Sequence, residues 1–416
     1  MVLTGKMLAR ATTPLRLRGA SASAAVTARS CGISTRVAAI GNNVFAEISL
    51  LAAQHGAVNL GQGFPSFHTP DSEYTGCIAS LMYSPLLKRE LNPMKEIVTF
   101  NGAQEGIASI MAALLEPGDE VVTFEPYFDA YKTVSTLLGI KTIGIPFELL
   151  PDKQQEFNCR DTNATFSSGD FRIDLDKLDQ TITKNTKMIV LNTPHNPTGK
   201  VFSKHELEQI AEVLKKHPHV LILSDEVYEF MAYDGLQHER IASFPGLFDR
   251  TISLFSAGKT FSCTGWRVGY AIAPEHLTAA ITKAHSTVPF CGTTPLEVAM
   301  ASCFKQVQTN GYLDELKATL EAKRDRLVGA LTEANWRPIV PEGGYFVCCN
   351  VTHLPVFQEF ADIKITPELP KPQYPDYQFA YKLCKDYKLA TIPTSPFFTH
   401  DKTVDAAIRV ISSFKS

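Results

Sequence analysis

Between about residue 97 and residue 275 the chain alternates short β-like runs with segments of helical periodicity. This alternation predicts a mainly parallel sheet wrapped by helices, because parallel strands need long crossover connections. Helices are predicted over Gly102–Leu115 and from the capping box Ser203–Glu206 through Lys216. The predicted strands are Val121–Phe124, Met188–Asn192, Val220–Leu223 and Thr251–Phe255. The pattern indicates an α/β fold whose ligands lie at the carboxyl ends of the strands.

The pattern changes after about residue 310, where a long charged helix is predicted over Leu313–Glu333. We interpret the polar stretch Thr162–Asp170 as an insertion with no evident chemistry. Four segments are therefore predicted: a presequence over residues 1–36, an arm or part of the small domain over 37–65, a large domain over 66–309, and a small α+β domain over 310–416.

The N-terminal stretch is basic and contains no acidic residue before Glu47. Six Lys or Arg residues lie among Ala, Ser and Thr within residues 1–36. This composition is typical of a mitochondrial presequence and predicts a location in the matrix. The alternatives are a cytoplasmic protein or a basic tail that carries no targeting signal.

The overall composition excludes several classes of protein. Hydrophobic residues make up 44% of the chain and charged residues 20%, as in an ordinary soluble enzyme. A net charge of −3 with no Lys/Arg block in the body gives no argument for a nucleic-acid partner. The apolar runs are too short to span a membrane. Nine scattered cysteines without a CxxC pair favour free buried thiols over disulfides or a metal site.

The segment Ser256–Arg267 places a serine, a lysine and an arginine directly after a predicted strand. A lysine past a strand end can be desolvated, lose its proton and form a Schiff base with an aldehyde. Ser256, three residues before Lys259, and Arg267, eight residues after it, would suit a phosphate dianion. An aldehyde and a phosphate on one molecule describe pyridoxal 5′-phosphate (PLP). Taken alone, Lys259 is better interpreted as a surface lysine beside a turn, so the hypothesis needs support from other residues.

Other residues near strand ends could complete a PLP site. A carboxylate at Asp225 could pair with the protonated ring nitrogen that makes PLP an electron sink. Tyr228 and Asn196 could hydrogen-bond the phenolic oxygen, and Phe128 could stack on the ring. The N–H groups that open the helix at Gly102–Gln104 could bind the phosphate. Taken singly, Asp225 also fits a helix cap, Asn196 an Asx turn, and Phe128 a core aromatic.

The motifs together resemble a known family. Asn192-x-Pro-x-Asn-Pro-x-Gly, Asp225-Glu-Val-Tyr228 and Ser256-x-x-Lys259-x-Phe-x-x-x-Gly-Trp-Arg267 resemble the class I/II aminotransferases of PLP fold type I. The stretches Val58–Pro65 and Glu125–Asp129 resemble more specifically the kynurenine aminotransferase/glutamine transaminase K family. The resemblance runs from about residue 40 to residue 410, and it implies a large PLP-binding domain beside the small domain.

The resemblance implies a role for each matching residue. Lys259 would carry the Schiff base and move the proton, and Asp225 would bind the pyridinium nitrogen. The other implied cofactor ligands are Asn196 and Tyr228 at the phenolate oxygen, Phe128 on the ring face, and Ser256, Arg267 and the amides of Ala103 and Gln104 at the phosphate. The implied substrate ligands are Arg409, which would clamp the α-carboxylate, and Asn192 and the Gly63 backbone, which would assist it. No metal is implied.

The resemblance also implies an activity, transamination between an amino acid and a 2-oxo acid by a homodimer. The implied donors are kynurenine, glutamine, and aromatic or sulfur amino acids, with β-lyase cleavage of cysteine S-conjugates as a side activity. The stretch Ser66–Phe100 is shorter than in the family and lacks its Asn-Gln-Tyr block, whose tyrosine would reach the phosphate of the partner subunit. A catalytically impaired or non-catalytic paralogue, or an incomplete gene model, with the same fold is therefore the alternative interpretation. Ser256-x-x-Lys259 also matches penicillin-interactive hydrolases, but their downstream Ser-Asp-Asn and Lys-Thr-Gly motifs do not follow Lys259.

Overall fold

The computed structural model describes residues 34, 78–150, 153, 166–366, 369, 373–399 and 410–413. Its largest element is a seven-stranded sheet in the order β1-β10-β9-β8-β7-β2-β3. The strands are β1 (Ile97–Phe100), β2 (Glu120–Glu125), β3 (Lys141–Pro146), β7 (Thr186–Asn192), β8 (Leu221–Asp225), β9 (Thr251–Phe255) and β10 (Gly269–Ile272). Strands β9, β8, β7, β2 and β3 are mutually parallel, whereas β10 is antiparallel to both of its neighbours. The predicted mainly parallel sheet is thus confirmed.

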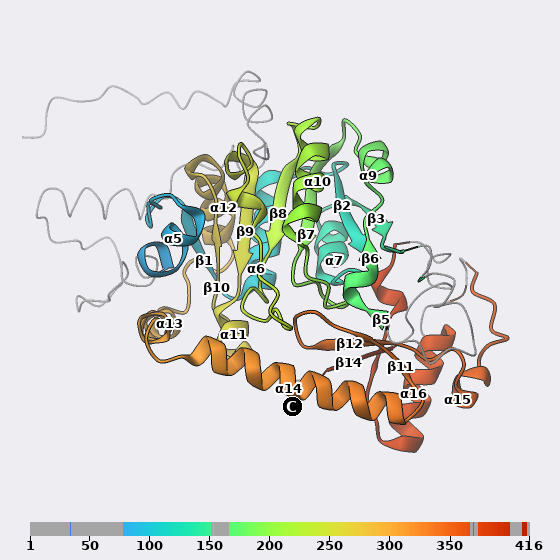
Figure 1. Ribbon diagram of the computed structural model, residues 1–416. Coiled ribbons are helices and arrows are strands. Elements are labelled where there is room, and N and C mark those ends of the chain that lie inside the picture. Colours follow the sequence, from blue (N-terminus) through green and yellow to red (C-terminus); the bar gives the residue numbers. More distant parts are fainter. Residues whose placement is uncertain are drawn as a thin grey trace, which may run out of the picture.

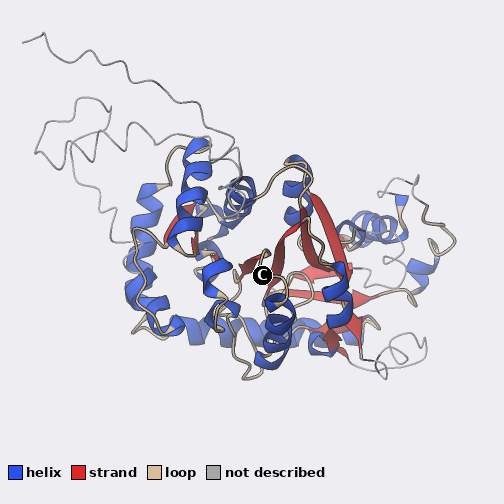
Figure 2. Ribbon diagram, turned by 90° about the horizontal axis from the view of Figure 1, so that it is seen from above, coloured by secondary structure: helices blue, strands red, loops and turns tan. Residues whose placement is uncertain are grey.

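Helices cover both faces of this sheet (Figures 1 and 2). One face carries α6 (Ala103–Leu114), α7 (Ala130–Leu137) and α12 (Glu275–Thr287), and the other carries α9 (Leu175–Thr181) and α10 (Lys204–Lys215). Successive residues of a strand point to opposite faces, so Leu223 joins the first core and its neighbour Ile222 the second. Both faces are buried, which explains why the central strands are continuous apolar runs.

A third core closes the β1 and β10 edge of the sheet. It is built by the π-helix η1 (Ile78–Tyr83), α5 (Ser84–Leu87) and α13 (Thr294–Val307) around the aromatic rings of Phe255, Tyr270 and Phe304. The rings of Phe255 and Tyr270 stack with their centroids 5.2 Å apart. This core anchors the last strand before the Lys259 turn.

The second sheet has five strands in the order β13-β14-β12-β11-β5. Its strands are β5 (Phe166–Ser167), β11 (Arg337–Val340), β12 (Phe346–Asn350), β13 (Ile392–Pro393) and β14 (Val410–Ser413). The helices α14 (Tyr312–Glu333), α15 (Pro355–Gln358) and α16 (Pro375–Tyr387) lie beside it. In Figure 1 the long helix α14 runs beneath the molecule from the large sheet to the small one. A separate two-stranded ladder pairs β4 (Glu148–Leu149) with β6 (Phe171–Arg172), in the stretch of chain between β3 and β7.

The stretch Thr162–Asp170, interpreted as an insertion with no evident chemistry, contributes to the second sheet in its described part. Residues Phe166–Ser167 form β5, which pairs in parallel with Ile339 and Val340 of β11. Ser167 then caps the short 3₁₀ helix η2 (Ser168–Asp170), with the reciprocal bond from Asp170. A two-residue strand has too little periodicity to be recognised in a sequence.

The helix signals were more informative than this short strand. The capping box before α10 is present in both directions: Ser203 Oγ accepts the Glu206 N–H at 3.2 Å, and Glu206 Oε2 accepts the Ser203 N–H at 3.0 Å. The helix predicted from Leu313 is α14, which begins one residue earlier and ends at Glu333 as expected.

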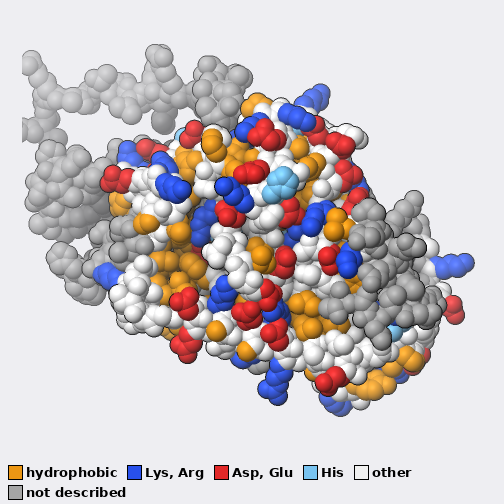
Figure 3. Space-filling model, in the orientation of Figure 1, with side chains coloured by type: hydrophobic (Ala, Val, Ile, Leu, Met, Phe, Trp, Pro, Cys, Tyr) orange, Lys and Arg blue, Asp and Glu red, His pale blue; other side chains and the backbone are white. Residues whose placement is uncertain are grey.

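On the surface seen in Figure 3, acidic and basic side chains are interspersed. Among the residues that the structure describes, no helix is long and apolar enough to cross a membrane, and no cluster of His, Cys, Asp and Glu could hold a metal ion. The described cysteines are free thiols. Cys348 and Cys349 are buried, as expected, but Cys291 and Cys384 are exposed.

Candidate active site

A cavity of about 220 Å³ lies at the carboxyl ends of the parallel strands. Each strand of the sheet's centre contributes the residues that follow it, because parallel strands end at one edge. Of the residues predicted for the cofactor or substrate, the lining includes Ala103, Gln104, Phe128, Asn192, Asn196, Asp225, Tyr228, Ser256, Lys259 and Arg267. Five segments far apart in the sequence therefore converge on one cavity.

Asp225, the last residue of β8, lies at the centre of the lining with only 3% of its surface exposed. Its Oδ2 accepts the Tyr131 hydroxyl at 2.5 Å, and its Oδ1 accepts the Val227 N–H at 3.3 Å. Burial raises the pKa of Asp225 to about 6, against the lowering effect of the Tyr131 hydrogen bond. The carboxylate is therefore desolvated but still hydrogen-bonded.

Lys259 lies on the short helix α11 (Ala257–Thr260) that follows β9. Its Nζ donates to the Tyr345 hydroxyl at 2.6 Å. Tyr345 directly precedes β12 of the second sheet. The Tyr228 hydroxyl also hydrogen-bonds to Tyr345, and burial raises the pKa of Tyr345 to about 12. Lys259, which follows the large sheet, is thus paired with a neutral phenol that adjoins the second sheet.

The start of α6 and the Arg267 turn form a site suited to an anion. The first N–H groups of a helix have no acceptor within it, and those of Ala103 and Gln104 open α6 at the cavity. Gly102 precedes them with φ of 90°, and a Cβ there would lie 2.3 Å from Arg267 Nη2. Only glycine lets the guanidinium approach this closely. Ser256, at the end of β9, lines the same cavity.

Asn192, the last residue of β7, and Asn196 hold the neighbouring chain together. Asn192 Nδ2 donates to the Asp225 carbonyl at 2.9 Å, and Asn192 Oδ1 accepts the Asn196 N–H at 2.6 Å. The side-chain amide of Asn192, predicted to assist substrate binding, is therefore engaged with the backbone on both sides. Asn196 is half-buried on the cavity wall.

Two predicted substrate ligands, Gly63 and Arg409, lie outside the residues that the structure describes. The lining also contains residues that sequence reasoning missed: Ile107, Tyr131, Val227, Thr264 and Phe346. Tyr131 is in the first turn of α7, three residues after Phe128, which lies in the turn just before the helix. Its ring meets that of Phe128 edge-on, with the centroids 5.7 Å apart.

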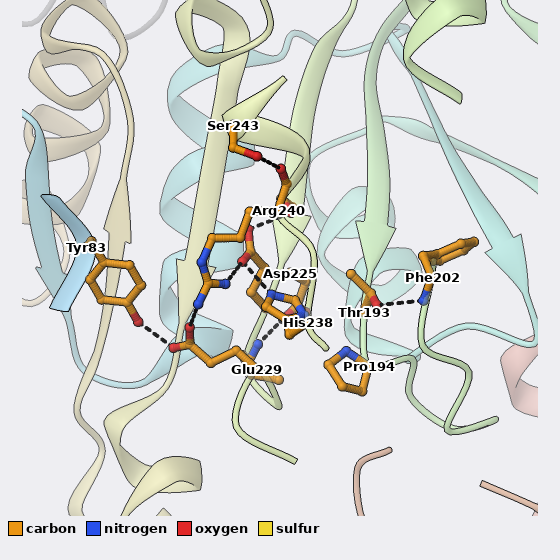
Figure 4. Close-up of polar contacts among 12 residues, drawn as sticks. Tyr83, Thr193, Pro194, Phe202, Asp225, Glu229, His238, Arg240 and Ser243 are labelled. Atoms are coloured by element: carbon orange, nitrogen blue, oxygen red, sulfur yellow. Dashed lines mark hydrogen bonds and ion pairs between the residues drawn. The ribbon is translucent and has the colours of Figure 1, made fainter. Parts of the chain in front are cut away.

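A buried charge network lies behind Asp225 (Figure 4). Glu226, the next residue, points to the other side and accepts Arg240 Nη1 at 2.6 Å and His238 Nε2 at 2.7 Å. Arg240 Nη2 reaches Glu229 at 2.5 Å, and Glu229 also accepts the Tyr83 hydroxyl of η1. Arg240, with its neighbours, holds the pKa of Glu226 down to about 2, whereas burial raises the pKa of Glu229 to about 7. One guanidinium thus binds two carboxyl groups whose pKa values are shifted in opposite directions.

The residues present fit PLP. The cavity offers a buried carboxylate, a lysine amine, an aromatic face at Phe128, and helix N–H groups beside Arg267, whose guanidinium packs where a Cβ at Gly102 would be. These four features match the ring nitrogen, the aldehyde, the ring face and the phosphate. Together with the doubly covered sheet and its smaller partner sheet, they define a PLP-dependent aminotransferase of fold type I.

Comparison with known proteins leads to the same class. The family model for aminotransferase class I and II matches residues 46–411, and the chain belongs to this family. Kynurenine–oxoglutarate transaminase of Dictyostelium discoideum is 37% identical over 88% of this chain and 89% of its own length. Human kynurenine–oxoglutarate transaminase 3 is 33% identical over 91% and 89%. N-succinyldiaminopimelate aminotransferase from Mycobacterium tuberculosis aligns with a TM-score of 0.69 and 29% identity, over 90% of this chain and 93% of the other. The chain is therefore an enzyme that transfers an amino group between an amino acid and a 2-oxo acid.

Proposed function

We propose that this aminotransferase uses kynurenine, glutamine, or aromatic and sulfur amino acids as donors and a 2-oxo acid as acceptor. The observation that carries the proposal is the convergence of Lys259, Asp225 and the α6 N-terminus on one cavity. The donor class is supported by relatives named as kynurenine–oxoglutarate transaminases that share about a third of their residues with this chain.

In the proposed reaction Lys259 Nζ is the base. Lys259 Nζ would hold PLP; when the incoming amino acid takes its place, the free amine would accept the proton from the substrate Cα and donate it to the neighbouring cofactor carbon. PLP, when bound, supplies the electron sink that stabilises the charge left at Cα. Asp225 would hold the proton of the ring nitrogen, and Phe128 would keep the ring flat against the sheet end.

The neighbours of Lys259 prepare it for this role. Tyr345 accepts a hydrogen bond from Nζ at 2.6 Å, so the amine is oriented when it is not attached to the cofactor. Ser256, Arg267 and the amides of Ala103 and Gln104 would hold the phosphate, and Asn196 and Tyr228 the phenolate oxygen. Arg409, with Asn192 and Gly63, would clamp the α-carboxylate of the substrate so that its Cα–H faces the ring.

Reductive labelling tests the cofactor assignment. The purified full chain should turn yellow with PLP, and borohydride should fix the label on the peptide that contains Lys259. Lys259→Ala should lose both the label and transamination of kynurenine with 2-oxoglutarate, whereas Lys95→Ala, an exposed lysine paired with Glu275, serves as the control. A parent protein that stays colourless and inactive at saturating PLP would refute the proposal and support an impaired paralogue.

A second experiment tests the substrate clamp. Arg409→Ala should weaken binding of the amino acid and leave binding of the decarboxylated amine unchanged, because the amine has no carboxylate to lose. If the parent protein binds the amino acid and the amine equally well, the assignment of Arg409 is wrong.

Three further parts of the proposal concern the whole protein. We propose a homodimer, which sedimentation of the holoenzyme would test, and a monomer at micromolar concentration would contradict it. We propose import into the mitochondrial matrix through residues 1–36, whose deletion should leave a fluorescent fusion in the cytoplasm.

We also propose β-lyase cleavage of cysteine S-conjugates, detected as release of pyruvate. No pyruvate from a protein that transaminates kynurenine would exclude this side activity alone.

A further inference from the structure

The main chain of Asp225 is fixed independently of its carboxylate. Its carbonyl oxygen accepts hydrogen bonds from Asn192 Nδ2 at 2.9 Å and from the Thr193 N–H at 3.1 Å. These bonds place the Cα atom, but the carboxylate can still rotate about two side-chain torsions. The orientation of the carboxylate must therefore come from its own hydrogen bonds.

Tyr131 makes the shorter of the two hydrogen bonds to that carboxylate. Its hydroxyl lies 2.5 Å from Oδ2, whereas the Val227 N–H lies 3.3 Å from Oδ1. Tyr131 is on the first turn of α7 with 1% of its surface exposed, and its ring is packed against the edge of Phe128. Because the ring is enclosed, the donor has no room to turn away from Asp225.

We propose that Tyr131 is a positioning residue that keeps the Asp225 carboxylate ionised and directed into the cavity, where it can hold the proton of the cofactor ring nitrogen. The inference rests on the proposed function, because the group that the Asp225 carboxylate would bind is the N–H of the cofactor's pyridine ring. An ionised carboxylate has about four acceptor sites. Tyr131 and Val227 occupy one each, and the remaining sites are left for the ring N–H.

The electrostatics around Asp225 support this role. Burial is the largest influence on its pKa and favours the protonated form, and the Tyr131 hydrogen bond is the largest one opposing burial. Glu226, the residue after Asp225, raises the pKa of Asp225, and Lys259 of α11 lowers it. Tyr228 faces Tyr131, whose own pKa is raised by burial and by the carboxylate, so both phenols are neutral. Tyr131 therefore acts as a neutral donor.

Tyr131→Phe removes the donor and keeps the ring against Phe128. The first measurement is the pKa of the Asp225 carboxyl in the cofactor-free full chain, by NMR with carboxyl-labelled aspartate and with Asp225→Asn to assign the signal. We expect the pKa to rise in the variant. An unchanged pKa would overturn the inference, whatever the variant does with PLP.

The second measurement is the PLP affinity as a function of pH, followed by the visible absorbance of the bound cofactor. Loss of a hydrogen bond to a charged group should weaken binding by roughly ten- to a hundredfold. Binding should also fail at a higher pH in Tyr131→Phe than in the parent, because Asp225 is ionised only above its pKa. The matched control is Tyr127→Phe, a fully buried neighbour whose hydroxyl bonds Thr399 Oγ1 at 3.2 Å and not Asp225.

The two measurements separate this inference from the proposed function. A raised Asp225 pKa with weaker, pH-shifted PLP binding supports both. A parent protein that binds no PLP while Tyr131→Phe still raises the Asp225 pKa refutes the proposed function and leaves the control of Asp225 by Tyr131 standing. Equal losses in Tyr127→Phe and Tyr131→Phe would show a packing effect and refute the positioning role.

Discussion

Arg240→Met tests the buried network behind the cavity. The guanidinium has a side-chain exposure of 9% and lies 2.6 Å from Glu226 and 2.5 Å from Glu229. Methionine keeps the unbranched apolar stem, so the packing beside Tyr83 and Phe255 changes little. The substitution therefore removes mainly the charge that two buried carboxylates share.

The expected cost follows from what each carboxylate keeps. Removing one partner of a buried ion pair typically costs about 3–5 kcal/mol. Glu226 retains His238 at 2.7 Å and Ser224 at 2.9 Å, and Glu229 retains Tyr83, so neither is left without a donor. We expect a loss of about 3 kcal/mol in the free energy of unfolding. The loss should be smaller below about pH 6, where the variant's carboxyls can take up protons.

Urea denaturation of the full chain, followed by circular dichroism at several pH values, measures this loss. The double variant Arg240→Met/Glu229→Gln is the control, because it also removes the Glu229 carboxyl group, one of the two left without Arg240, and should recover part of the stability. A loss below about 1 kcal/mol that does not change with pH would refute the reasoning, since it would mean that the network contributes no more than exposed ion pairs do.

Three further predictions concern single side chains. Burial raises the pKa of Glu229 to about 7, so the folded state holds a proton that the unfolded state releases near pH 4.5. The free energy of unfolding should therefore fall as pH rises between about 4.5 and about 7. Glu229→Gln should flatten that slope in pH-dependent denaturation. Ser203→Ala removes the cap that accepts the Glu206 N–H and should cost about 1 kcal/mol in the same assay, and no loss would show that the cap is replaced by water. Gly102→Ala places a Cβ 2.3 Å from Arg267 Nη2 at a φ of 90° and should weaken PLP binding in a titration, whereas unchanged affinity would show that Arg267 does not take part.

The sequence could predict most of the site because its residues follow recognisable strands. Asp225 ends an apolar run, and Lys259 comes four residues after another. Once such runs are assigned to a parallel sheet, their carboxyl ends must lie together, and no knowledge of packing is needed. The order of motifs then specified which chemistry the cluster serves.

The contacts that sequence reasoning missed are those made by partners distant in the chain. Tyr131 and Asp225 are 94 residues apart, and Lys259 and Tyr345 are 86 apart. No local periodicity relates such pairs, because their distance depends on how a helix packs on the large sheet and how the second sheet lies beside it. The same holds for Arg240, which in the sequence is one charged residue in a loop and in the structure links two glutamates.

The pairing of β5 with β11 has a consequence for how this protein can be divided. Phe166–Ser167 form the edge of the second sheet, although β3 before them and β7 after them in the sequence belong to the first. A fragment that begins at residue 310 would lack this edge strand and expose the backbone groups of β11. The C-terminal part is thus not an exchangeable module. Recombination with a relative near residue 310 would have to replace residues 166–167 as well. Otherwise β5 of one protein would pair with β11 of the other.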